Sequence, residues 1–366
     1  MSKARITERI FTLAAALLAA GVLAGCGRTA APASPAPVET AAGGLVSGAA
    51  ETSVPDASAK KISVVATIFP EYDWIRNIVG ENADHVKIRQ LLDKGVDMHS
   101  FQPTAEDMMT IASCDLFVYV GGESDSWTAD ALKNSVNPDQ ISVNLMETLG
   151  SRVKEEELVE GMQEEDHDHD HEHEGEAHDH EHGPAEAPEY DEHVWLSLKN
   201  AEVLTERLAD ALAEADPACA DSYRENAKQY AEKLAALDKE FAETVAAAPK
   251  KTVLFGDRFP FRYLTDDYGL DYYAAFAGCS AETEASFETI VFLTEKADEL
   301  GLGAVLTIEN SDQKIAKTIA SGTKTKDQKV LVMDSMQSVT AADAAGGRDY
   351  LERMRGNLEV LKEALK

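Results

Sequence analysis

The chain has 366 residues, long enough for two domains of ordinary size with tails, and it is strongly acidic, with 66 Asp and Glu against 34 Lys and Arg and a net charge of −32. This charge argues against nucleic acid as a partner, because phosphates require a basic surface. It suits a cation as ligand.

The N-terminus has the pattern of an export signal. Basic residues precede an apolar run over 10–23 that is too short to span a membrane, and small residues followed by Cys26 close this run. The closing Leu-Ala-Gly-Cys resembles a bacterial lipobox. We therefore predict a lipoprotein signal peptide over 1–25, lipid modification of Cys26, and a disordered Ala/Pro/Gly-rich tether over 26–60. The alternative is an ordinary secretory signal with a chance cysteine.

The first folded region alternates strand and helix patterns. Short apolar and β-branched runs are typical of buried strands, and they predict strands over 62–69, 86–92, 116–120 and 141–145. Thr104 begins a capping-box sequence, and Ser197 is a suitable N-cap for a helix that ends before Pro217. We assign 61–216 to a first α/β lobe.

One long helix is predicted after this lobe. Neither Gly nor Pro occurs between Pro217 and Pro249, and apolar residues recur at alternating steps of four and three from Tyr223 to Phe241. Thirty residues of helix span roughly 45 Å, the length of a whole domain. We therefore predict that 217–248 forms a rigid helix between two lobes.

The strand and helix alternation then restarts. Strands are predicted over 252–255, 272–276, 304–308 and 329–333, with helices between them and a final amphipathic helix over 348–365. This second run predicts a second α/β lobe over 249–366, and both sheets should be mainly parallel. Ligands of such sheets bind beyond the carboxyl ends of the strands.

Polar residues follow several of these predicted strands. His99, Asp257, Glu309 and Asp334 come just after strand ends, and His193 opens the segment that leads into the helix after Ser197. Two imidazoles with two or more carboxylates can bind a divalent metal ion, either Zn²⁺ or the more oxygen-preferring Mn²⁺. The three acidic residues could instead be helix N-caps.

An acidic insert with seven of the ten histidines interrupts the first lobe over 153–192. Its high charge and low apolar content predict disorder, and ordering the chain around a metal ion costs entropy, so each site should be weak. The alternative is a solvated insert without function. The histidines are His167, His169, His171, His173, His178, His180 and His182.

Three cysteines remain besides Cys26. Cys114, Cys219 and Cys279 permit at most one disulfide. None has the sequence spacing of a thiolate metal site.

Five motifs occur in an order that resembles a known family. They are ATIFP at 66–70, GVDMHSFQPTAED at 95–107, GGESDSW at 121–127, DEHVWLS at 191–197 and VLVMDSM at 330–336. Together they resemble the zinc and manganese solute-binding lipoproteins of bacterial ABC transporters, the ZnuA- and TroA-like family. The resemblance covers 62 to the C-terminus. It implies two (β/α) lobes joined by one rigid helix, with a metal ion in the interlobe cleft.

The resemblance also implies a ligand set. His99 and His193 match the ligands of the first lobe, and Asp334 matches the carboxylate after the last strand of the second lobe. The family places a further ligand, His or Glu, after the first strand of the second lobe, and the ungapped alignment puts Arg258 there. Arginine stays protonated and cannot bind a metal ion.

Three acidic residues could replace that missing ligand. Asp257 is one residue earlier, and Glu309 and Glu284 are the other candidates.

The resemblance finally implies a transport function. We expect a lipid-anchored monomer on the outer face of the cytoplasmic membrane that captures Zn²⁺, with Mn²⁺ as the alternative, and delivers it to an ABC permease and its ATPase. The His-rich insert would raise the local zinc concentration. A surface metal buffer or adhesin that uses the insert as its main site is one alternative. A metallohydrolase is another, although the sequence lacks H-E-x-x-H and G-x-S-x-G.

Overall fold

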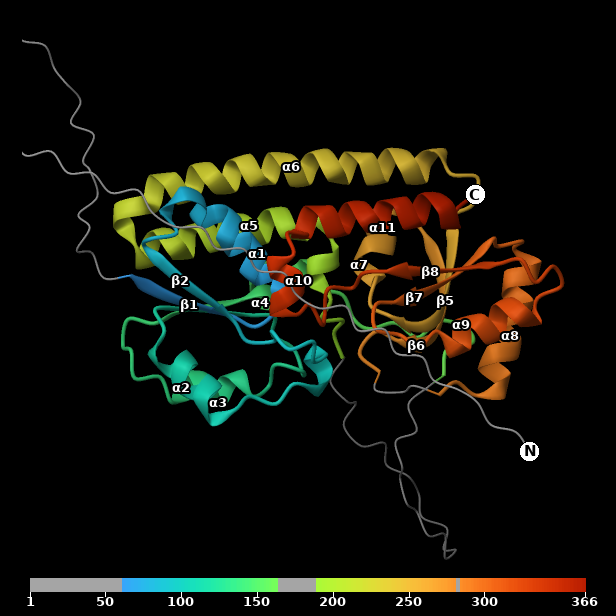
Figure 1. Ribbon diagram of the computed structural model, residues 1–366, viewed down its shortest axis with the longest axis horizontal. Helices are drawn as coiled ribbons and strands as arrows, with labels where there is room; N and C mark the ends of the chain where they lie inside the picture. Colours follow the sequence, from blue (N-terminus) through green and yellow to red (C-terminus); the bar gives the residue numbers. More distant parts are fainter. Residues whose placement is uncertain (1–60, 164–188, 281–283) are drawn as a thin grey trace, which may run out of the picture. The chain divides into compact units, whose positions relative to one another are not determined.

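The computed structural model describes residues 61–163, 189–280 and 284–366 (Figure 1). The predicted signal peptide, Cys26, the tether and all seven histidines of the insert lie outside these described residues, and the predictions for them stay predictions. The described residues belong to one compact unit. Within them, no helix is both long enough and apolar enough to cross a membrane.

The first lobe is built on a parallel sheet of four strands in the order β2-β1-β3-β4. Val64 and Phe117 at its centre are buried, as expected for a parallel sheet covered on both faces. Its strands are β1 (Ile62–Ala66), β2 (Val86–Gln90), β3 (Leu116–Tyr119) and β4 (Ile141–Asn144), and its helices are α1 (Phe69–Val79), α2 (Ala105–Ser113), α3 (Thr128–Lys133), α4 (Leu145–Leu149) and α5 (Leu198–Ala215). The predicted capping box begins α2, where the Thr104 hydroxyl accepts from the Asp107 N–H and the Asp107 carboxylate accepts from the Thr104 N–H.

The second lobe repeats this plan with strand order β6-β5-β7-β8, again all parallel. Helices α8 and α9 pack on one side of the sheet, and α11 packs against β7 and β8 (Figure 1). Its strands are β5 (Thr252–Phe259), β6 (Asp271–Ala277), β7 (Ala304–Ile308) and β8 (Lys329–Met333), and its helices are α7 (Arg262–Tyr268), α8 (Phe287–Glu299), α9 (Lys314–Gly322), α10 (Ala341–Ala345) and α11 (Tyr350–Ala364).

Strand β5 is longer than the sequence predicts. It continues past Phe255 to Phe259, with a shift of register between Phe255 and Arg258. Helix α9 passes so close that a Cβ on Gly256 would lie 2.6 Å from the Ala316 Cα, so only glycine fits there. Asp257 and Arg258 therefore lie within an irregular strand and not in the predicted loop after it.

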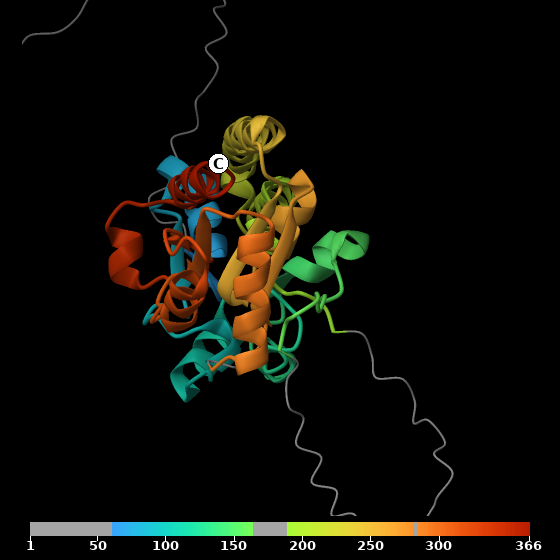
Figure 2. The same cartoon turned by 90° about the vertical axis from the view of Figure 1, so that its right-hand side faces the viewer.

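Helix α6 (Ala220–Ala247) joins the two lobes. Its 28 residues span about 42 Å, and its buried face packs against α1 and α5 of the first lobe and against α7 and α11 of the second (Figures 1 and 2). The buried positions are those that the periodicity predicts, including Tyr223, Leu234 and Phe241. The predicted α/β fold with two mainly parallel lobes is confirmed.

The predicted disordered insert over 153–192 is too wide at both ends. Residues 153–163 and 189–192 make defined contacts: Glu155 and Tyr190 form an antiparallel bridge, and the Gln163 N–H donates to the Ala275 carbonyl of β6 at 2.9 Å. Met162 packs against the core. These segments are ordered because their backbone groups and scattered apolar side chains find partners on the second lobe, which composition alone does not show.

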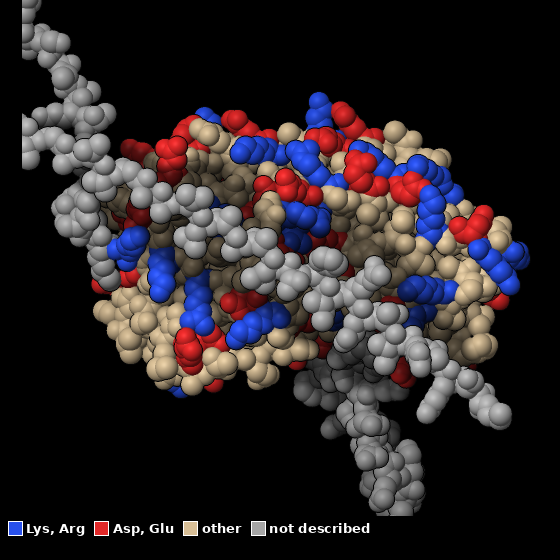
Figure 3. Space-filling view, in the orientation of Figure 1, with Lys and Arg blue, Asp and Glu red and all other residues tan. Residues whose placement is uncertain are grey.

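Surface charge is mixed on the face seen in Figure 3. Lys and Arg alternate there with Asp and Glu, most clearly along α6 and α11.

Candidate metal centre

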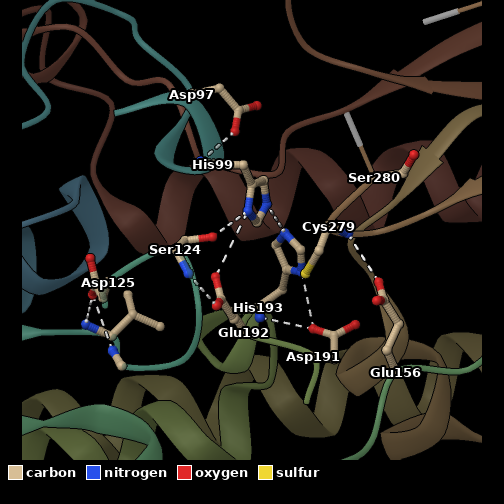
Figure 4. Close-up of polar contacts among 12 residues, drawn as sticks. Asp97, His99, Ser124, Asp125, Glu156, Asp191, Glu192, His193, Cys279 and Ser280 are labelled. Carbon is tan, nitrogen blue, oxygen red and sulfur yellow. Dashed lines mark hydrogen bonds and ion pairs between the residues drawn. The ribbon is translucent and has the colours of Figure 1, made fainter. Parts of the chain in front are cut away.

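His99 lies in a short 3-10 helix, Met98–Ser100, on the way from β2 to α2. Asp97 caps this turn by accepting from the His99 N–H at 3.1 Å. The His99 side chain is only 8% exposed, and its Nδ1 lies 2.7 Å from the Ser124 hydroxyl. The contact with Ser124 fixes the ring and leaves Nε2 to face the interior (Figure 4).

His193 lies just before a second 3-10 turn, Val194–Leu196, and is fully buried. Asp191 accepts from both the backbone N–H of His193, at 2.8 Å, and its Nδ1, at 3.0 Å. Tyr263 of α7 donates its hydroxyl to the Asp191 carbonyl at 2.7 Å, which holds this segment against the second lobe. His193 therefore also directs Nε2 away from its carboxylate partner.

The two Nε2 atoms meet at 3.3 Å (Figure 4). With Zn–N bonds of 2.0–2.1 Å in a tetrahedral arrangement, two imidazole nitrogens on one zinc ion lie about 3.3–3.4 Å apart. Protons on both Nδ1 atoms, as their partners favour, leave two lone pairs facing one point. The pair is therefore arranged for a shared proton or a metal ion.

The electrostatics of the pair agree with this arrangement. Burial, followed by the charge of His193, lowers the pKa of His99 to about 3. Burial also opposes protonation of His193, but the carboxylates of Asp191, Glu192 and Asp97 together outweigh it, so the pKa of His193 is raised. His99 therefore stays neutral, and a single cation on the pair is favoured.

A cavity of about 500 Å³ lies between the lobes beside His99. Asp257 and Glu309, both predicted as candidate ligands, line it from the second lobe. Glu309 accepts from the backbone N–H and the hydroxyl of Ser335 at 2.6 and 2.7 Å, and burial raises its pKa to about 7. Asp257 accepts from the Arg258 N–H at 2.9 Å.

Asp334 is placed differently from these two residues. Its carboxylate is paired with Arg353 of α11 at 2.7 Å. The backbone N–H of Met336 also donates to it, at 3.1 Å. The ion pair directs this carboxylate toward α11, so its role as a ligand is a prediction that the geometry does not favour.

Arg258 occupies the cavity at the position where the resemblance implies a ligand. Its guanidinium pairs with Asp97 across the lobes at 2.6 Å and donates to the Ser280 carbonyl at 3.4 Å. The Gln337 amide lies beside Asp97 and His193. With its amide turned so that donors meet acceptors, its oxygen lies 3.1 Å from His193 Nε2 and accepts from that nitrogen when it is protonated in place of a metal ion, and its own nitrogen donates to Asp97 at 3.3 Å.

Cys279 is the functional candidate that sequence reasoning missed. Its Sγ, one ring nitrogen of His99 and one of His193 all lie within 4.8 Å of one another (Figure 4). It follows the carboxyl end of β6, so the rule that polar residues after strands form sites could have identified it. The spacing of the cysteines along the chain gives no such signal, because Cys279 has no second cysteine close to it in the sequence.

Comparison with known proteins identifies the family. The model of the family described as "Zinc-uptake complex component A periplasmic" matches residues 64–364. The chain belongs to this ZnuA family. The shared region includes both lobes and α6, so the family accounts for the whole described fold.

Relatives with similar sequences point to the same family. The "Zinc-binding protein AdcA" of Streptococcus pyogenes is 30% identical over 302 residues, which cover 82% of this chain and 56% of the relative. This chain thus spans little more than half the length of the streptococcal relatives. The "High-affinity zinc uptake system protein ZnuA" of Bacillus subtilis is 30% identical over 312 residues, covering 85% of this chain and 89% of that protein.

A solved structure of the family is also similar. The Zn(II)-bound ZnuA-like domain of Streptococcus pneumoniae AdcA has a TM-score of 0.63 and 25% identity, covering 83% of this chain and 99% of that one. The laminin-binding protein Lmb of Streptococcus agalactiae, at 24% identity and a TM-score of 0.62, shares the fold.

Proposed function

We propose that this chain captures Zn²⁺ outside the cytoplasm and delivers it to an ABC permease powered by an ATPase. The observation that carries the proposal is the pair of Nε2 atoms of His99 and His193, 3.3 Å apart and each oriented by a partner on Nδ1. Zinc-binding relatives support the choice of metal, with Mn²⁺ as the alternative.

The proposal includes how the protein acts in the cell. The mature chain is a monomer attached through a lipid on Cys26, and it binds and releases its ion without making or breaking a substrate bond. The His-rich tract collects zinc weakly and raises its concentration near the cleft.

A competition titration against a zinc chelator tests the tight site. The His99→Ala, His193→Ala protein should lose the one tight site and keep weaker ones. The matched control is His169→Ala, His171→Ala, which removes two imidazoles from the tract and should keep the tight site.

The opposite outcome supports another function. Tight binding retained without His99 and His193 but lost with the tract would contradict this proposal and favour a metal buffer or adhesin. Zinc-dependent hydrolysis of a test ester that is lost in the double variant would favour the metallohydrolase.

A further inference from the structure

We propose that Cys279 supplies a thiolate ligand from the second lobe, in place of the residue that Arg258 replaces, and thereby makes the site selective for Zn²⁺ over Mn²⁺. This inference rests on the proposed function and names the ligand chemistry of the same site.

The geometry brings the thiol to the two imidazoles. Zn–S bonds of 2.3 Å and Zn–N bonds of 2.0–2.1 Å in a tetrahedral site place sulfur about 3.6 Å from each nitrogen. The thiol sulfur and one ring nitrogen of each histidine lie within 4.8 Å of one another, so a closure of at most about 1 Å brings three ligand atoms to bonding distance. The group joins His99 and His193 of the first lobe to Cys279 of the second, so binding an ion would link the lobes.

The loop approaches His193 because residue 278 is glycine. A Cβ at Gly278 would lie 2.9 Å from the Phe259 carbonyl oxygen, closer than real Cβ contacts, and 3.0 Å from the Cε1 of His193, tighter than most of them. Any side chain here would move the loop away from the imidazole. The glycine thus places the next residue, Cys279, at the metal centre.

Two contacts from opposite sides hold the loop in place. The Cys279 N–H donates to Glu156 Oε1 at 3.1 Å, from the ordered start of the insert (Figure 4). Arg258 donates to the carbonyl of Ser280 while its other nitrogen pairs with Asp97. Arg258 cannot bind the ion itself, but it ties the thiol-bearing loop to the lobe that carries the histidines.

The chemistry of a thiolate explains the selectivity. On binding, the Cys279 S–H bond breaks, its proton leaves to solvent and the sulfur lone pair forms the Zn–S bond. The set that these residues supply is two neutral imidazoles and one thiolate, and the fourth tetrahedral position is left to water or a carboxylate. Thiolate ligands favour zinc, whereas Mn²⁺ prefers oxygen ligands.

The experiment uses cobalt(II) as a spectroscopic substitute for zinc. The purified full chain with one equivalent of Co²⁺ should show a near-ultraviolet sulfur-to-cobalt charge-transfer band, which imidazole and carboxylate ligands do not give. Cys279→Ser should lose this band while circular dichroism and thermal melting show an intact fold. Zinc affinity should fall at least about tenfold, and manganese affinity should change little.

Cys219→Ser is the matched control. The Cys219 thiol also lies beside an imidazole, 3.5 Å from His85 Nδ1, in a separate group with Asp216. The band should be unchanged in this variant. A second variant, Cys279→Asp, replaces the thiolate by a carboxylate, and should bind without the band and with a smaller preference for zinc.

The outcomes separate this inference from the proposed function. A band that persists in Cys279→Ser, or that is absent from the wild-type protein at full cobalt occupancy, overturns the thiolate ligand. In that case, loss of tight zinc binding in the His99→Ala, His193→Ala protein would still support the proposed function.

Discussion

The two lobes contribute to the proposed metal centre in different ways. The first lobe provides two buried imidazoles, each with Nδ1 held by a neighbour of its own lobe, Ser124 or Asp191. The second lobe provides a loop thiol and carboxylates that are engaged elsewhere, such as Glu309 with Ser335.

The half-site of the first lobe is preorganised, whereas that of the second lobe is adjustable. The first half needs no rearrangement to bind an ion, because its Nε2 atoms already have the spacing of two ligands on one zinc. The thiol of the second half would move by at most about 1 Å, which suits the part that closes on the ion and opens again for release. The family's ligand motifs are present in the first half, whereas in the second half Arg258 stands where the family has a His or Glu ligand.

The largest effect should come from removing an imidazole of the first lobe. His193→Ala should weaken zinc binding more than about 100-fold, since even changes to residues that only orient a ligand cost 10- to 100-fold. Chelator competition measures this loss. A loss smaller than that for Cys279→Ser would reverse the roles of the two lobes.

Loss of the carboxylate behind His193 should rank second. Asp191→Asn removes the charged acceptor on Nδ1, so zinc affinity should fall about 10- to 100-fold. Ser124→Ala removes one partner of His99 and leaves the Glu192 carboxylate 3.8 Å from the same Nδ1, so it should cost less. Equal losses in the two variants would contradict a larger role for the carboxylate behind His193.

The ion pair across the lobes should have a smaller effect. Arg258→Met removes the ion pair with Asp97. Both side chains are about a fifth exposed, so solvent weakens the pair, and zinc binding should fall only roughly fivefold. Asp97→Asn should give a similar loss, because asparagine can still accept from the His99 N–H, and the double variant should lose less than the sum of the two, because both changes remove the shared ion pair. Full additivity of the two losses in a double-mutant cycle would contradict a shared role.

Replacing the tract histidines should have the least effect on the tight site. Asn at all seven positions should remove the weak zinc sites seen by calorimetry and leave the tight affinity within about twofold. A deletion starting at Val153 would be a poorer test, because it also removes Glu156, which holds the Cys279 loop. A weakened tight site in the seven-Asn protein would place the tract within the centre itself.

Sequence patterns predict the parts of this protein that depend on local periodicity. The strands, the long helix α6 and the N-caps follow from apolar spacing and capping residues, and the motifs around His99 and His193 point to the first half of the proposed site. The extension of β5 past Phe255 depends on the approach of α9 to Gly256, which no local pattern encodes.

The second half-site could not be predicted in the same way. The placement of Cys279 depends on contacts with residues far along the chain, Glu156 and Arg258 among them, and on the missing Cβ of Gly278. Asp334 shows the converse case. Its motif points to a ligand, but Arg353 of α11 pairs with its carboxylate, and that contact is set by how the last helix packs.

Anomalous diffraction at the zinc edge, from crystals of the full chain loaded with one equivalent of Zn²⁺, tests the central claim most directly. The account predicts a single strong peak between His99 Nε2 and His193 Nε2, about 2.0–2.1 Å from each. A strong peak elsewhere, with these two imidazoles free of metal, would contradict it.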